Sequence, residues 1–172
     1  LRNGTATIGD NKTCSFGRHG LARRLEFDLV SSSDTSITYS LKANDKTKEQ
    51  YPYDFELQMT YELTEHGVKV SHTVINHDSV VMPYCVGGHP AFNCPVFENE
   101  SFEDYIVEFE QPENAACAQL TEDGLINNAD RVSVLENEAV IPVRHSLFYN
   151  DALVVDALKS RKVALIHKNT GH

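Results

Sequence analysis

Residues 55–74 read FELQMTYELTEHGVKVSHTV, and this stretch decides the fold class. Over residues 55–63 apolar side chains alternate with polar ones, and the alternation resumes over residues 68–74. Successive side chains of a β-strand point to opposite faces of a sheet, so each half predicts a strand with one buried and one solvated face. The EHG at residues 65–67 is typical of a turn. The stretch therefore predicts an antiparallel hairpin of two long strands.

Shorter segments outside the hairpin predict further strands, at residues 37–42, 105–110, 152–156 and 162–167. Residues 45–50 are polar and predict a loop or short turn, and residues 111–114 and 127–130 predict turns. The alanine-rich residues 115–120 are too short for a helix, and no window of about 12 residues has helical periodicity. We expect an all-β protein, a large antiparallel β-sandwich in which two sheets pack face to face in one domain over residues 1–172.

The composition is that of a folded, acidic protein. The 172 residues are 41% hydrophobic and 23% charged, with 25 acidic against 15 basic side chains, for a net charge of −10. Such a chain can bury a sizeable core, and disorder is not expected. It has no positive surface for a phosphate backbone, so nucleic acid and an anionic membrane surface are not expected partners. No stretch approaches the roughly 20 apolar residues that span a bilayer.

The first residues and the cysteines carry two separate expectations. Leu1 begins a stretch, LRNG, that lacks an initiating methionine and does not resemble a signal peptide, so we expect it to lie inside a gene product. The chain has Cys14, Cys85, Cys94 and Cys117, and their spacing matches no zinc site. We expect free thiols in a cytosolic protein, although the spacing leaves a disulfide open.

Residues 18–24, RHGLARR, gather basic side chains in an acidic chain. His19 is followed by a glycine, and Arg23 offers a planar fork of donors that suits vicinal hydroxyls, a carboxylate or a phosphate. A binding turn and a plain solvated basic turn are equally good interpretations of this stretch alone.

Residues 82–93, MPYCVGGHPAFN, present a histidine in an unusual setting. The glycine pair before His89 allows backbone conformations closed to other residues and lets the backbone approach a ligand. Pro90 then restricts the chain just after the histidine. A histidine held in this way suits a general acid or base near neutral pH, whereas a lone histidine is more often structural.

Residues 148–155, FYNDALVV, place Asn150 and Asp151 directly before an apolar segment. The Asp151 carboxylate could accept hydrogen bonds from sugar hydroxyls. An Asx turn that opens a strand is the alternative, and it is the better interpretation of this stretch taken alone.

Together these stretches resemble the aldose 1-epimerase (galactose mutarotase) family. The resemblance rests on HGLAR at residues 19–23, YPYDF at 51–55 and GGHPAFN at 87–93, in the family's order. The GGHPAFN stretch is the most specific of the three, and NDAL at residues 150–153 fits the branch related to bacterial LacX proteins. The resemblance covers nearly the whole chain.

The resemblance implies a β-sandwich with a sugar cleft across one sheet, and interconversion of the α and β anomers of a hexose. One group removes the proton of the C1 hydroxyl while an acid protonates the ring oxygen, and no metal or organic cofactor is needed. His89 would be the acid. His19 and Arg23 would hold sugar hydroxyls, or Arg23 a 6-phosphate. Asp151 would accept hydrogen bonds from sugar hydroxyls, and Phe92 would face the pyranose ring or belong to the core. The expected partner is a small sugar, and the expected assembly a monomer or homodimer.

One departure from the family pattern matters for the chemistry. Family members are longer, and their general base is a glutamate close to the C-terminus, whereas this chain stops at His172. We therefore expect a partial chain without its base. Three hypotheses remain: a mutarotase active in full-length form, a non-catalytic sugar-binding protein, and a hexose-6-phosphate epimerase, the last favoured by the arginines beside His19.

Overall fold

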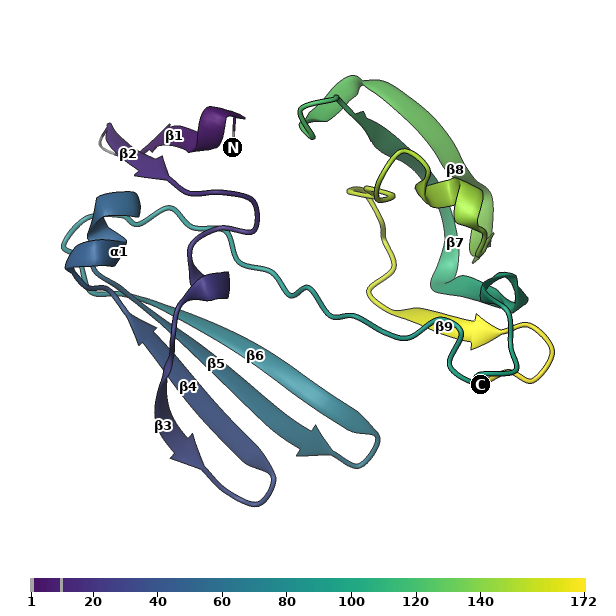
Figure 1. The fold of residues 1–172 in the computed structure, drawn as a ribbon, viewed down its shortest axis with the longest axis horizontal. Coiled ribbons are helices and arrows are strands. Elements are labelled where there is room, and N and C mark those ends of the chain that lie inside the picture. Colours follow the sequence, from purple (N-terminus) through teal and green to yellow (C-terminus); the bar gives the residue numbers. More distant parts are fainter. Residues whose placement is uncertain (1, 10) are drawn as a thin grey trace. The chain divides into compact units, whose positions relative to one another are not determined.

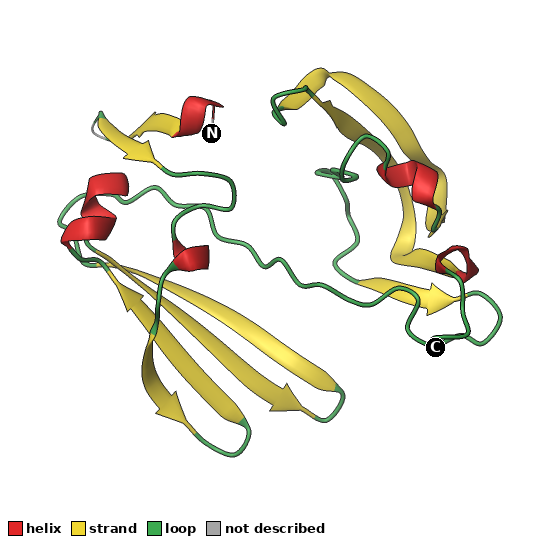
Figure 2. Ribbon diagram, viewed as in Figure 1, coloured by secondary structure: helices red, strands yellow, loops and turns green. Residues whose placement is uncertain are grey.

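Antiparallel strands dominate the structure, a computed structural model that describes residues 2–9 and 11–172 (Figure 1). Figure 2 shows how short the helical turns are beside the strands. The expected all-β class is confirmed. By its internal contacts the chain divides into two compact units, the first ending at Gly88 and the second beginning at His89. The expectation of one domain over residues 1–172 stays a prediction.

The first unit is built on a four-stranded sheet in the order β3-β4-β5-β6. Its strands are β3 (Asp28–Ser32), β4 (Ser36–Lys42), β5 (Phe55–Thr64) and β6 (Gly67–Asn76). β5 and β6 pair without a register shift from Phe55 opposite Asn76 to Thr64 opposite Gly67. The predicted hairpin is therefore confirmed, as is the strand expected at residues 37–42, which is β4.

The apolar face of this hairpin is buried at one end only. Leu41, Tyr53, Phe55 and Met82 form a buried cluster, and other apolar residues pack around it. Toward the turn of the hairpin the same face becomes exposed, with 62% of Leu63 and 59% of Val68 accessible to solvent. Alternation thus predicted which side chains share a face, and the described structure covers only part of that face.

A small two-stranded sheet, β1 (Thr5–Ile8) with β2 (Lys12–Ser15), lies beside the YPYDF stretch. The Lys12 ammonium donates to the Pro52 carbonyl at 2.9 Å and lies 4.1 Å from the centre of the Tyr53 ring. This cation–π contact and hydrogen bond join β2 to the segment that enters β5. A single-turn 3₁₀ helix, η1 (Arg2–Gly4), precedes β1.

The polar residues 45–50 form a helix, α1 (Asp45–Gln50), so the predicted loop was wrong. The reason is a capping box. The Asn44 side chain accepts the Thr47 backbone N–H at 3.1 Å, and the Thr47 hydroxyl accepts the Asn44 N–H at 2.8 Å. Each side chain satisfies a backbone donor that a helix N-terminus leaves unpaired.

The second unit is a three-stranded sheet in the order β8-β7-β9. Its strands are β7 (Tyr105–Leu120), β8 (Ile126–Pro142) and β9 (Val163–His167), with 3₁₀ turns η3 (Phe102–Asp104) and η4 (His145–Phe148). Strands predicted at residues 105–110 and 162–167 are confirmed. The turns predicted at residues 111–114 and 127–130 were wrong, because β7 and β8 run through them with irregular register.

The strand predicted at residues 152–156 is also wrong, because this segment has no strand pairing. It is held instead by side chains. Arg131 on β8 forms an ion pair with Asp156, 2.5 Å between Nη2 and Oδ1. The buried Glu113 carboxylate on β7 accepts hydrogen bonds from the Lys159 and Ser160 amides and from the Ser160 hydroxyl. These two anchors fix an irregular path over a core formed by the buried residues Ala115, Leu135 and Ile141.

All four cysteines are free thiols in this structure. Cys14 and Cys117 are buried, and burial raises the pKa of both thiols. They behave as small core residues in the two units and have little thiolate character at neutral pH.

Candidate functional site

The basic stretch at residues 18–24 forms a tight turn in the first unit. The Gly20 N–H donates to the Gly17 carbonyl at 3.2 Å, and the 3₁₀ turn η2 (Ala22–Arg24) follows. His19 lies in the left-handed region with φ of 70°, a conformation that costs most side chains about 1–3 kcal/mol. Leu21 packs against the core, so the turn is anchored by its apolar residue and projects its basic ones.

These basic residues surround a hollow of about 700 Å³. Arg18, His19, Arg23 and Arg24 line it, together with Gln50 from the end of α1. The structure therefore brings two predicted site residues, His19 and Arg23, to one cavity. Guanidinium groups converging on a hollow supply donors for hydroxyls or for an anionic group.

His89 and Phe92 lie on the irregular segment that joins β6 to β7. Both side chains are exposed, and Phe92 is 80% accessible. Phe92 is therefore an apolar ring on the surface of the described structure and not a core residue. An exposed histidine after a glycine pair can exchange protons with a bound molecule.

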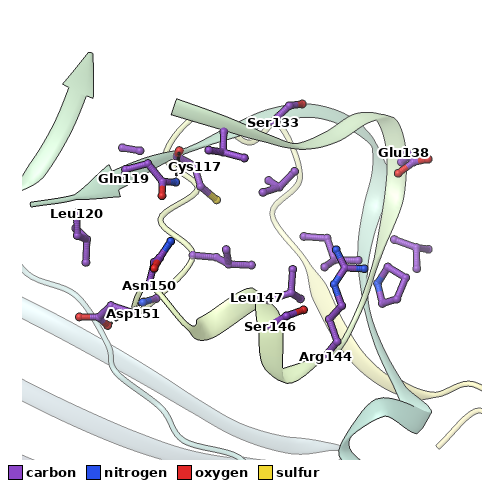
Figure 3. A pocket seen from close by; sticks show the side chains of 18 residues that line it. Cys117, Gln119, Leu120, Ser133, Glu138, Arg144, Ser146, Leu147, Asn150 and Asp151 are labelled. Carbon is purple, nitrogen blue, oxygen red and sulfur yellow. Dashed lines mark hydrogen bonds between the residues drawn. The ribbon is translucent and has the colours of Figure 1, made fainter. Parts of the chain in front are cut away.

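Asp151 lies in the second unit, three residues after the end of the 3₁₀ turn η4. Its N–H donates to the Phe148 carbonyl at 3.2 Å, its φ is 77°, and its carboxylate accepts the Ala152 N–H at 2.8 Å. An Asx turn would bond the amide two residues on, whereas this carboxylate bonds the next amide, and no strand follows. Asp151 borders a hollow of about 420 Å³ between η4 and the β7–β8 ribbon (Figure 3).

Sequence reasoning did not single out the polar neighbours of Asp151 in this hollow. Asn150 points toward Gln119 and Cys117 in Figure 3, and Arg144 lines the same hollow from the start of η4. Gln119 lies on β7, far from Asp151 in the chain, so no local sequence pattern predicts that the two residues line one hollow. Asn150 is the exception, because it is adjacent to Asp151 in the NDAL stretch.

The five predicted residues are therefore distributed over three segments. His19 and Arg23 share a hollow in the first unit, Asp151 borders a hollow in the second, and His89 and Phe92 lie on the segment at which the second unit begins. Within residues 2–9 and 11–172 no group of three or more His, Cys, Asp or Glu side chains could hold a metal ion. In the same residues no helix is long and apolar enough to cross a membrane.

Three well-shielded glutamates are poor candidates for a general base. Glu56 on β5 accepts hydrogen bonds from Gln58, Ser40 and His77, which lower its pKa to about 2. Hydrogen bonds from Ser160 likewise lower the pKa of Glu113. A base works best with a pKa near the working pH, so both carboxylates suit structural roles.

The pKa of Glu100 is also lowered, although burial opposes the shift more strongly here. Burial raises its pKa, but the hydrogen bonds that it accepts from Tyr105, Phe97 and His172 outweigh burial, and the pKa is lowered. Its carboxylate is already fully engaged, so it too is unsuited to remove a substrate proton.

Known proteins place this chain in a family. The aldose 1-epimerase family model matches residues 2–171. The plasmid and chromosomal LacX proteins of Lactococcus lactis subsp. lactis are each 39% identical over 156 residues, which cover 90% of this chain and 52% of theirs. The chain thus spans about half the length of the curated relatives it matches.

Two solved structures have the same fold. A galactose mutarotase related enzyme from Lactobacillus acidophilus matches with a TM-score of 0.81 and 28% identity, over 91% of this chain and 51% of that one. A galactose mutarotase-like protein from Lactobacillus casei matches with a TM-score of 0.82 and 29% identity, over 95% and 55%. These matches confirm the predicted sandwich class and the resemblance drawn from the GGHPAFN and HGLAR stretches. The chain belongs to the aldose 1-epimerase family.

Proposed function

We propose that this protein is a carbohydrate isomerase that interconverts the α and β anomers of a hexose, with His89 as the general acid. The observation that carries the proposal is the exposed His89 on its glycine-rich segment, together with the donor-lined hollow at His19 and Arg23. The names of the two solved neighbours, both related to galactose mutarotase, support the substrate class.

The reaction needs two proton transfers and no redox change. A base removes the C1 hydroxyl proton while the His89 imidazolium protonates the ring oxygen, so the C1–O5 bond breaks and an open-chain aldehyde forms. Rotation about C1–C2 presents the other face of the carbonyl, and the reverse transfers close the ring. Each positioned group contributes about 10²–10⁴-fold to the rate.

The binding residues have simpler roles. His19 and Arg23 donate hydrogen bonds to sugar hydroxyls, and Asp151 accepts one. Phe92 offers an apolar face to the pyranose ring. We assign the role of the base to a carboxylate in the length that the relatives have beyond the matched region, and not to Glu56, Glu100 or Glu113. We propose a cytoplasmic enzyme, monomer or homodimer, acting on a free hexose.

Polarimetry of freshly dissolved α-D-galactose and α-D-glucose tests this proposal. The protein in its full-length form should speed the approach to anomeric equilibrium, and His89→Ala in that form should lower the rate by about 10²-fold or more. His66→Ala, which removes an exposed histidine from the turn of the β5–β6 hairpin, is the matched control and should keep the full rate. An unchanged rate in His89→Ala would remove His89 from the mechanism.

A second candidate function is epimerisation of a hexose 6-phosphate. It is favoured by the three arginines around the hollow at His19, because a guanidinium fork matches phosphate geometry. Glucose and glucose 6-phosphate should be compared with wild type, with Arg23→Ala, and with Lys69→Ala as a control for net charge. A preference for the phosphate that only Arg23→Ala abolishes supports this candidate, whereas a preference for the free sugar rejects it.

A non-catalytic sugar-binding protein is the remaining candidate, because one fold hosts many functions. It is favoured by the lowered pKa values of Glu56, Glu100 and Glu113, which make these three shielded glutamates unsuited to act as the base. It requires saturable binding of galactose or glucose with no change in the rate of mutarotation.

A further inference from the structure

The segment that carries His89 is irregular between residues 83 and 97, yet it is tied down near both ends. The segment forms no strand or helix. Its glycine pair increases backbone freedom, whereas its prolines restrict it. A histidine that must protonate one particular oxygen needs a defined position, because a displacement of about 1 Å can cost about 10²-fold in rate. The question is what holds this segment in place.

The first anchor is Tyr51, in the YPYDF stretch to which the proposed mechanism gives no role. Its hydroxyl donates to the Pro83 carbonyl at 2.6 Å. Its ring packs against Tyr53 and Phe55, with ring centres 4.9 and 5.6 Å away. Burial raises the pKa of Tyr51 to about 12, so its hydroxyl keeps the proton that it donates.

The second anchor is Tyr105, the first residue of β7, whose residue exposure is 0%. Its hydroxyl accepts the Val96 N–H at 3.0 Å and donates to the Glu100 carboxylate. Glu100 also accepts the Phe97 N–H at 3.2 Å. One buried hydroxyl and one carboxylate thus hold two consecutive amides just after the GGHPAFN stretch.

The two anchors use the same group in opposite roles, because the Tyr51 hydroxyl donates to a carbonyl and the Tyr105 hydroxyl accepts an amide N–H. In each, the hydroxyl of a tyrosine packed into its own unit makes a hydrogen bond to the backbone of the segment, on opposite sides of His89. Tyr51 belongs to the first unit and Tyr105 to the second, as do the backbone atoms that they hold. Each hydrogen bond holds the segment to its own unit and so reduces backbone freedom on one side of His89.

We propose that Tyr51 and Tyr105 are positioning residues for His89, and that their hydroxyls define where the imidazole is presented to the sugar. The inference rests on the proposed function of His89. Neither tyrosine touches the substrate. Both act through the backbone between residues 83 and 96.

The test uses Tyr51→Phe and Tyr105→Phe, which keep the rings and remove one oxygen each. Tyr61→Phe, on the partly exposed end of β5, is the matched control. Backbone ¹⁵N relaxation should show increased mobility at Gly88 and His89 in both anchor variants and not in the control. Thermal unfolding and circular dichroism establish that each variant is folded. Tyr105→Phe removes a hydrogen-bond donor from Glu100 and could fail to fold. In that case Tyr51→Phe alone tests the proposal.

The activity arm separates positioning from general damage. Each anchor variant should lower kcat for mutarotation about 10-fold with little change in KM, and the loss should disappear when His89 is already alanine. Equal losses in the His89 and His89→Ala backgrounds, or unchanged mobility at His89, would overturn the inference. If His89→Ala itself loses no activity, the proposed function fails, and the relaxation result alone then decides whether the tyrosines hold the segment.

Discussion

Two segments of this chain have sequences typical of strands, and only one of them forms strands. β5 and β6 pair over their whole length, and β5 also pairs with β4. Residues 152–156 are as apolar, but they follow an irregular path fixed by Arg131 and Glu113. The difference teaches that apolar sequence predicts burial, whereas a strand also needs a neighbouring strand with free backbone groups. Side-chain anchors from distant strands can replace that pairing.

The largest expected effect is on the paired region. Phe55→Ala should lower the free energy of unfolding by about 3–5 kcal/mol, because Phe55 is only 6% exposed and belongs to the core of the first unit. Leu63→Ala on the same strand should change it by less than about 0.5 kcal/mol, since Leu63 is 62% exposed. Urea unfolding of both variants measures the contrast. Equal losses would mean that the exposed end of the hairpin is buried in solution.

The next largest effect is expected at the buried anchor of the unpaired segment. Glu113→Gln keeps the size of the side chain but weakens the hydrogen bonds from Lys159 and Ser160. Amide hydrogen exchange at Ser160 should become about 10-fold faster or more. Glu110→Gln, which affects only the hydrogen bond from the Arg161 amide, should leave Ser160 unchanged. Unchanged exchange in Glu113→Gln would show that apolar packing alone holds the segment.

Acid should weaken the paired region through Glu56. Its pKa is lowered from 4.5 to about 2 by hydrogen bonds from Gln58, Ser40 and His77. The resulting stability is fully present above pH 4.5 and is lost as the pH falls toward 2, where the folded protein also binds the proton. Urea midpoints between pH 6 and 2 should fall less steeply in Glu56→Gln than in wild type. Identical pH profiles would argue against this contribution.

The smallest effect is expected at the exposed anchor. The Arg131–Asp156 pair is partly open to solvent, with side-chain exposures of 30% and 48%, so water and salt screen it. Asp156→Asn should shift the unfolding midpoint only slightly, and the shift should shrink further in 1 M salt. A loss as large as that of Glu113→Gln would reverse the ranking of the two anchors.

The sequence was informative where the structure is set by local pattern. Alternation from Phe55 onward located the hairpin, and the shorter segments at residues 37–42 and 162–167 located β4 and β9. Helix α1 was missed because six polar residues have no apolar period, although Asn44 and Thr47 carried the capping signal. Polar residues inside β7 and β8 predict turns, but these strands pair with irregular register, and a bulged strand tolerates polar residues.

For the candidate site, the sequence could indicate the side chains but not what holds them. His19 and Arg23 lie four residues apart on one turn, so a shared hollow follows from their spacing. Tyr51 contacts Pro83 and Tyr105 contacts Val96 across the fold, and no spacing rule predicts such pairs. The apolar residues after Asp151 predict a strand, and the sequence does not reveal the anchor at Glu113, which lies on a distant strand and holds this segment without strand pairing.

The most direct test of the central claim is exchange spectroscopy of the anomeric protons of galactose at equilibrium. The account predicts that the protein produces exchange cross-peaks between the α and β anomers and that His89→Ala removes them while the thermal unfolding midpoint stays the same. Cross-peaks of equal intensity with His89→Ala would contradict the account, because the ring oxygen would then receive its proton from another group.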